Sequence, residues 1–80
     1  METAYTLMEA IKQRGVASIR QLSRELHMSP HTVIDYLRFF EEKGWVKSER
    51  IGRTKLVALT PEGEKVLEQL SQIITQFSVP

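Results

Sequence analysis

Four side chains that can hydrogen-bond to nucleic-acid bases lie close together near the middle of the chain. They are His31, Thr32, Asp35 and Arg38. Their spacing would place His31, Asp35 and Arg38 on one face of a helix, with Thr32 beside them. Imidazole, hydroxyl, carboxylate and guanidinium groups all read base edges in the major groove of DNA. The pattern predicts a helix that contacts double-stranded DNA, although His31 and Thr32 would also suit the first turn of an ordinary surface helix.

The acidic member of this group has a second interpretation. Asp35 can accept a hydrogen bond from a cytosine amino group, but a carboxylate on this face also repels DNA phosphates. We therefore prefer a pairing role, in which Asp35 binds and orients Arg24 or Arg38. Arg38 has its own alternatives, because it can reach a guanine or a phosphate, or pair with Glu42 four residues later for a few tenths of a kcal/mol.

The limits of this helix can be read from its flanking residues. Ser29 suits the N-cap and Pro30 the first helical position, where a missing N–H has no cost. Gly44 can adopt the left-handed conformation that ends a helix. The apolar residues between these limits recur at helical spacing and predict one buried face: Val33, Leu37 and Phe40.

A second group of cations surrounds a predicted hairpin turn. Arg50, Arg53 and Lys55 lie close to Gly52, which can take a positive φ. Three cations on a short turn suit contact with the sugar–phosphate backbone or the minor groove. The alternative is that they protect an edge strand from pairing with another chain.

Three residues near the second predicted helix are further candidates for phosphate contact, which are Ser18, Arg20 and Arg24. The net charge is only +1, but residues 14–55 carry nine Lys and Arg against five Asp and Glu, and both ends of the chain are acidic. A basic middle is typical of a nucleic-acid-binding surface. It is also compatible with ordinary solvated helix faces.

Composition excludes several classes of function. Eighty residues with 41% hydrophobic content predict one folded domain, 1–80, and the absence of cysteine excludes disulfides and thiolate metal sites. Two histidines without other ligands do not make a metal site, and neither a phosphate-binding glycine loop nor a nucleophile motif is present. We therefore expect no cofactor, no metal and no enzymatic activity. No membrane-length apolar run or secretion signal is visible, which predicts a cytoplasmic protein.

The elements that position these residues follow from periodicity and from turn residues. Helices are predicted over residues 3–14, 18–27, 29–43 and 61–77. A hairpin is predicted over residues 45–59, with its turn at Arg50–Arg53, and a very short strand near Val16 fits as well. In the first two helices the apolar positions are Ala4, Leu7, Met8, Ile11, Ile19, Leu22 and Leu26. The predicted fold class is mostly α-helical with a small β-hairpin.

The last helix has more apolar surface than a small domain needs. Val66, Leu67, Leu70, Ile73, Ile74 and Phe77 form a stripe along it. A second copy of the chain would bury the far half of this stripe, whereas the alternative is a helix that folds back on its own domain. The predicted homodimer interface consists of Leu70, Ile73, Ile74 and Phe77, with Tyr5 and Met8 added from the first helix.

Three segments in this order resemble the winged helix-turn-helix domains of prokaryotic transcription regulators, such as the MarR, ArsR and PadR groups. Residues 19–29 resemble their second helix and turn. Residues 32–46, which end in Glu42-Lys43-Gly44-Trp45-Val46, resemble their recognition helix and first wing strand. Leu59-Thr60-Pro61-Glu62-Gly63 resembles the junction before their last helix. The resemblance covers residues 7–70 and implies the element order α-α-α-β-β-α.

The resemblance also implies a function. It predicts a regulator, most simply a repressor, that binds DNA as a homodimer, with the third helix in the major groove and the hairpin on the backbone. The alternatives are a chromatin-like DNA binder of low specificity and a winged-helix protein–protein interaction module. The chain lacks both the cysteine metal sites of some ArsR relatives and the extra helices that build MarR ligand pockets, so no small-molecule effector is expected. The resemblance to DNA-binding regulators therefore predicts a cytoplasmic protein that is associated with the nucleoid.

Overall fold

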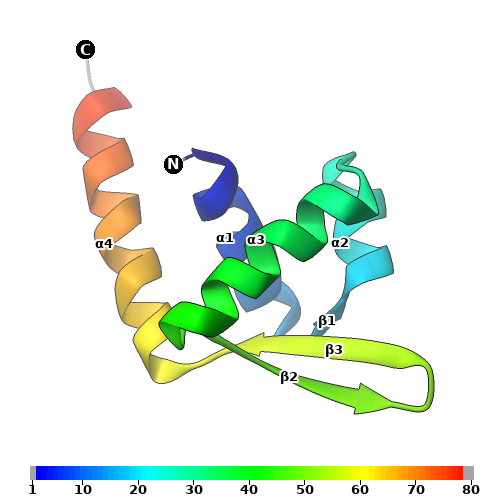
Figure 1. The fold of residues 1–80 in the computed structure, drawn as a ribbon. Helices are drawn as coiled ribbons and strands as arrows, with labels where there is room; N and C mark the ends of the chain where they lie inside the picture. Colours follow the sequence, from blue (N-terminus) through cyan, green and yellow to red (C-terminus); the bar gives the residue numbers. More distant parts are fainter. Residues whose placement is uncertain (1, 79–80) are drawn as a thin grey trace.

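Helices and a small sheet surround one buried cluster of apolar side chains. The computed structural model describes residues 2–78 and the side chains of residues 2–76, and Figure 1 shows how its helices and strands are arranged. The elements in chain order are α1 (Glu2–Arg14), β1 (Ala17–Ser18), α2 (Ile19–Leu26), α3 (Pro30–Lys43), β2 (Val46–Ile51), β3 (Thr54–Leu59) and α4 (Pro61–Ser78). This confirms the predicted order and fold class. Ser78, expected in a frayed end, is helical, and Val79 and Pro80 lie outside the described residues.

Local capping sets the ends of the two central helices. Ser18 is the N-cap of α2, where its hydroxyl accepts from the Gln21 N–H (3.1 Å) and the Gln21 side chain accepts from the Ser18 N–H (2.9 Å). Ser29 caps α3 in the same way by accepting from the Thr32 N–H (3.2 Å). At the other end, α3 stops at Gly44, whose φ is +77°. Both predicted caps and the predicted glycine stop are confirmed.

The three strands form an antiparallel sheet in the order β1-β3-β2. The hairpin turn is shorter than the predicted four residues, because Arg50 pairs with Lys55 and Ile51 with Thr54. The turn therefore consists of Gly52 and Arg53, and Gly52 has the positive φ (+63°) that the first position of a type II′ turn requires. The hairpin ladder continues two residues further than the sequence pattern indicated. We call β2, β3 and this turn the wing.

The core lies where α1, α2, α3 and the sheet meet. Phe40 and Trp45 connect α3 to the start of β2, with ring centroids 6.0 Å apart. Ala10, Ala17 and Leu67 are also buried, which periodicity alone did not assign to the core. The complete set of buried apolar residues in the described chain is Leu7, Met8, Ala10, Ile11, Ala17, Leu22, Val33, Leu37, Phe40, Val46, Val57 and Leu67.

The junction between the wing and α4 is unusually close. The Thr60 N–H donates to the Trp45 carbonyl (3.0 Å), and the Thr60 hydroxyl accepts from the Gly63 N–H (3.0 Å) while donating to the Gly44 carbonyl. Gly63 lies so near the strand that a Cβ there would be 1.9 Å from the Trp45 oxygen. The first turn of α4 therefore contacts the segment that ends α3.

Candidate nucleic-acid interface

The exposed face of α3 carries the predicted base-reading residues. The side chains of His31 and Asp35 are 87% and 58% exposed, and His31 Nε2 lies 3.7 Å from Asp35 Oδ2. Arg38 is exposed further along the same helix. The predicted pairing of Asp35 with Arg24 or Arg38 is wrong, because its partner among the described side chains is His31, one helical turn away. None of the described ion pairs joins Arg38 to Glu42.

The two hydroxyls at the start of α3 bind each other. Ser29 Oγ and Thr32 Oγ1 are 2.9 Å apart, and both residues are exposed. Ser29 also caps the helix, so its hydroxyl has a structural partner already. Thr32 keeps free acceptor capacity toward solvent. These residues therefore lie at the exposed start of the helix, where a recognition helix meets base edges.

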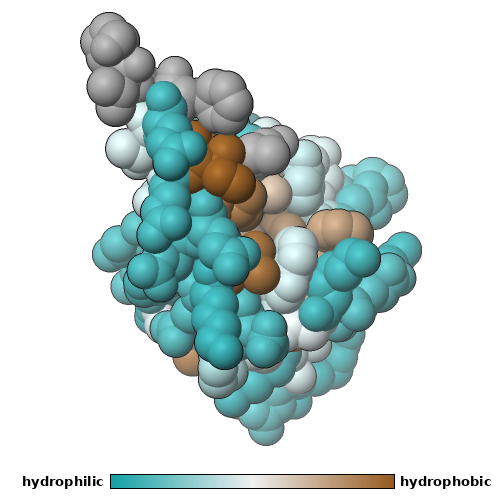
Figure 2. Space-filling model, turned by 90° about the vertical axis from the view of Figure 1, so that its left-hand side faces the viewer, coloured by the Kyte–Doolittle hydropathy of each residue, from teal (hydrophilic) through white to brown (hydrophobic). Residues whose placement is uncertain are grey.

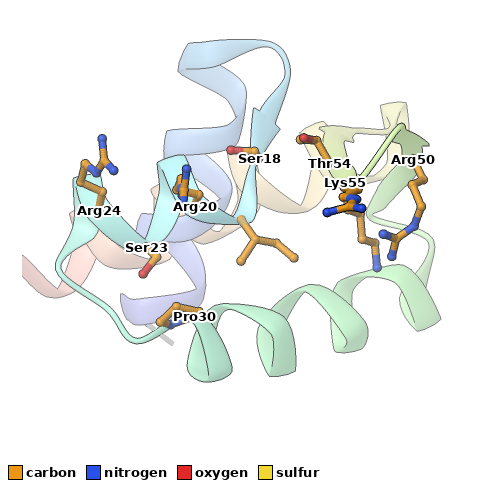
Figure 3. Close-up of a pocket in the computed structure, with 10 residues that line it drawn as sticks. Ser18, Arg20, Ser23, Arg24, Pro30, Arg50, Thr54 and Lys55 are labelled. Atoms are coloured by element: carbon orange, nitrogen blue, oxygen red, sulfur yellow. The ribbon is translucent and has the colours of Figure 1, made fainter.

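A basic groove lies between α2, the start of α3 and the wing (Figure 3). Its volume is about 670 Å³. Figure 3 shows Arg20 and Arg24 on the α2 side, Arg50 and Lys55 on the wing side, and Pro30 on α3. No carboxylate lines it among the described residues. The residues that form the basic groove are Ser18, Ile19, Arg20, Ser23, Arg24, Pro30, Arg50, Arg53, Thr54 and Lys55.

The groove brings together two predicted groups that are far apart in the sequence. The α2 candidates and the wing cations were each predicted to contact DNA, and they line one concave surface. Ser23 and Thr54 also line this groove, and neither was predicted from the sequence to contact DNA. The sequence could have identified Ser23 as a groove residue. It lies three residues after Arg20 and immediately before Arg24, so the three side chains share one face of the helix. The position of Thr54 in the groove depends on the two-residue turn, and the sequence predicted a longer turn.

The acidic residue of α2 does not neutralise this groove. Glu25 forms an ion pair with Arg14 of α1, with Nε and Oε2 2.7 Å apart. This pair lies outside the groove and leaves Arg20 and Arg24 without a carboxylate partner among the described ion pairs. Two guanidinium groups on consecutive turns therefore remain available for an anion.

One wing cation is not free. Lys55 Nζ lies 3.0 Å from Glu41 Oε1 on α3, so the wing and α3 are joined by an ion pair. Burial acts to raise the pKa of Glu41, but Lys55, Ser48 and the nearby Arg38 outweigh it and hold the pKa below its ordinary value. Lys55 was expected to act with Arg50 and Arg53 on DNA. Its charge is instead partly offset by Glu41, so Arg50 and Arg53 are the stronger wing cations.

The lowered pKa of Glu41 gives a pH-dependent contribution to folding. Because the carboxyl has a lower pKa when folded, its stabilisation is present above the unfolded-state pKa and is lost as the pH falls through the folded-state pKa. We expect Glu41→Gln to lower the free energy of unfolding near neutral pH by about 0.2–1 kcal/mol, as for other partly exposed pairs. Urea unfolding at neutral and acidic pH measures this difference, which should disappear in acid. Glu42→Gln controls for charge removal, and an equal, pH-independent effect of both changes would contradict the prediction.

The predicted dimer residues differ in their exposure. Leu70 and Ile74 are half-buried, Ile73 is 37% exposed, and Tyr5 of α1 is half-buried. Met8 is fully buried inside its own domain, so its assignment to a dimer interface is wrong. Its helical position turns it toward the core together with Leu7. The side chain of Phe77 lies outside the described residues.

Other kinds of site are not evident in the described part of the chain. It holds no cluster of three or more His, Cys, Asp or Glu side chains arranged to bind a metal ion. None of its helices combines the length and the apolar character needed to cross a membrane. The basic groove and the exposed face of α3 are therefore the candidate functional surfaces of the described residues.

A capped helix with an exposed polar face, next to a basic hairpin, defines the winged-helix class of DNA-binding domain. Residues 2–47 match the family described as winged helix-turn-helix DNA-binding. The chain belongs to this family.

Solved structures share the fold. MarR from E. coli superposes with a TM-score of 0.86 and 23% identity, over 92% of this chain and 57% of that one. A protein from Archaeoglobus fulgidus superposes with a TM-score of 0.85 and 25% identity, over 99% of this chain and 91% of that one. MarR bound to operator DNA also superposes, with a TM-score of 0.82 and 23% identity, over 92% of this chain and 55% of that one.

Curated relatives are longer proteins. The riboflavin kinase of Pyrococcus abyssi is 32% identical over an alignment of 80 positions that covers 94% of this chain and 38% of that protein. The phenylalanine–tRNA ligase alpha subunit of Methanopyrus kandleri is 33% identical over 69 residues, which are 86% of this chain and 13% of that protein. The chain therefore spans only a minor part of these relatives.

Proposed function

We propose that this protein is a transcriptional regulator that binds double-stranded DNA with sequence specificity. The observation that carries the proposal is the basic groove, where four arginines and one lysine from α2 and the wing line one surface together with Pro30 at the start of α3. Cations beside the start of a reading helix are suited to neutralise phosphates of the DNA backbone next to the major groove. That MarR has been crystallised with operator DNA supports this choice of ligand for the shared fold.

The proposed contacts divide into two kinds. His31, Asp35 and Arg38 read base edges from α3, with Thr32 and Ser29 at the end that enters the groove first. Asp35 accepts only, so it favours a base with an amino group, such as cytosine. The phosphate contacts fix the register of the helix, and they come from Ser18, Arg20, Arg24, Arg50, Arg53 and Lys55.

We propose that the active form is a homodimer held by α4. The C-terminal turns of α4 extend beyond the rest of the domain in Figure 1, and Figure 2 shows hydrophobic side chains gathered along one side of this helix. On α4 itself, Leu70 and Ile74 are half-buried and Ile73 is 37% exposed, so each leaves apolar surface for a partner. The proposed interface also includes Tyr5 of α1 and Phe77, which follows them in the sequence. A second copy that packs on this surface would bury it. From the resemblance to transcription regulators we further propose that this protein represses transcription by excluding polymerase, in the cytoplasm at the nucleoid.

Selection of bound sequences from random duplex DNA tests this function. We expect an enriched palindromic motif, with half-sites about one helical turn (~34 Å) apart, because two copies of α3 are related by a two-fold axis. A single ungapped half-site would contradict the dimer, and retention without any motif would favour a chromatin-like binder. No retention of DNA would favour a protein-interaction module.

A matched selection with Asp35→Asn tests the base-reading role of α3. The amide keeps the size of the side chain but adds a donor, so we expect the preference at one base pair of each half-site to change while the remaining positions persist. Glu9→Gln, on α1 away from the groove, is the control and should return the wild-type motif. An unchanged motif with Asp35→Asn would remove Asp35 from the proposed reading face.

A further inference from the structure

Thr60 connects the reading helix to α4 through three hydrogen bonds. Its hydroxyl donates to the carbonyl of Gly44, the residue that ends α3, and accepts from the Gly63 N–H in the first turn of α4. Its own N–H donates to the Trp45 carbonyl, 3.0 Å away. The hydroxyl of Thr60 therefore donates to the carbonyl of the residue that follows α3 and caps the start of α4 at the same time.

The surrounding packing makes this connection stiff. Trp45 donates its N–H to the Phe40 carbonyl (2.9 Å), so the junction continues directly into α3. Gly63 already leaves no space between α4 and the Trp45 carbonyl. Elsewhere α4 packs mainly on α1, and α3 packs mainly on α2 and β2. Figure 1 shows that α3 and α4 meet at this end of the domain.

Small movements at this junction would become large at the reading end of α3. The helix has 14 residues, so it is about 20 Å long. Gly44 is at its C-terminal end, whereas His31 and Thr32 are at the opposite end. A rotation of about 10° at the junction would move the reading end by about 3.5 Å, which equals roughly one base-pair step.

We infer that Thr60 is a positioning residue that sets the separation of the two reading helices, and thereby the half-site spacing that the dimer accepts. The inference rests on the proposed function, because it takes α4 as the dimer helix and α3 as the reading helix. In that arrangement, the angle between α3 and α4 within each protomer determines how far apart the two copies of α3 lie. Thr60 fixes this angle because its hydroxyl bonds to the end of α3 at Gly44 and to the start of α4 at Gly63.

Three substitutions separate the two roles of the hydroxyl. Thr60→Ser keeps both hydrogen bonds. Thr60→Asp keeps the N-cap of α4, because a carboxylate accepts from the Gly63 N–H, but it has no proton to donate to Gly44. Thr60→Val removes both bonds while keeping the shape of the side chain. Thr60→Asp is the decisive variant, because its retained cap supports folding, which a thermal melt verifies.

The test measures binding to duplexes that carry two selected half-sites, with the spacer unchanged or altered by one base pair. We expect wild type and Thr60→Ser to lose about tenfold or more in affinity when the spacer changes, since each base pair also rotates the half-site. Thr60→Asp and Thr60→Val should lose less than about threefold. Wild-type discrimination by a folded Thr60→Asp, or binding by the wild type without spacing preference, would overturn the inference. A wild type that binds no duplex would instead overturn the proposed function.

Discussion

Replacing both Arg50 and Arg53 with alanine is expected to weaken binding to duplex DNA by about 100-fold at roughly physiological salt. Both residues line the basic groove, and neither belongs to an ion pair among the described residues. Each guanidinium that neutralises a phosphate contributes through counterion release, so the slope of log K against log salt should also become shallower by about two for each protomer. Fluorescence anisotropy with the selected duplex measures both quantities.

The control removes the same charge from another surface. Lys12 and Lys65 line a hollow between α1 and α4, which also contains Glu9, Glu64 and Glu68. Lys12→Ala/Lys65→Ala should leave the affinity within about threefold of wild type, because this hollow is outside the proposed interface. Equal losses in the two double variants would show that only net charge matters. An unchanged affinity in Arg50→Ala/Arg53→Ala would remove the wing from the interface.

Gly63→Ala is expected to lower the free energy of unfolding by more than about 3 kcal/mol, or to prevent folding. Its Cβ would lie 1.9 Å from the Trp45 oxygen and 2.9 Å from the Trp45 carbonyl carbon. These are backbone atoms, so no side chain can rotate away to make room. Alanine in a helix would otherwise stabilise by about 1 kcal/mol, which makes the sign of this prediction distinctive. Urea unfolding provides the measurement.

Gly52→Ala is the matched control, because it adds the same methyl group in open space. Its cost comes only from the positive φ (+63°) of the turn, and we expect about 1–2 kcal/mol. If Gly63→Ala is no more destabilising than Gly52→Ala, then α4 and the start of β2 are further apart than the structure places them. The hydrogen bonds of Thr60 would then need reassessment as well.

Features set by neighbouring residues were predictable from the sequence. The Ser18 and Ser29 caps and the Gly44 helix stop depend on groups within a few residues of each other, so residue type and spacing determine them. Val33, Leu37 and Phe40 were found by the same logic, since helical periodicity identifies a buried face. These features were sufficient to place the exposed polar face of α3 opposite its buried face.

Contacts between distant segments were not predictable in the same way. The ion pair of Lys55 with Glu41 depends on how the wing lies against α3. Met8 has helical periodicity suited either to the core or to a partner, and only packing shows that it is buried. The groove itself requires α2 and the wing to meet. Sequence spacing constrains positions along an element, but it does not determine the distance between elements.

The salt dependence of DNA binding by the wild-type protein is the sharpest test of whether this surface neutralises DNA phosphates. Five arginines belong to the proposed interface and to none of the described ion pairs: Arg20, Arg24, Arg38, Arg50 and Arg53. If each neutralises one phosphate, log K should fall linearly with log salt, with a slope of about −4 to −5 for each protomer. A slope near zero, or no binding to duplex DNA at low salt, would contradict the account.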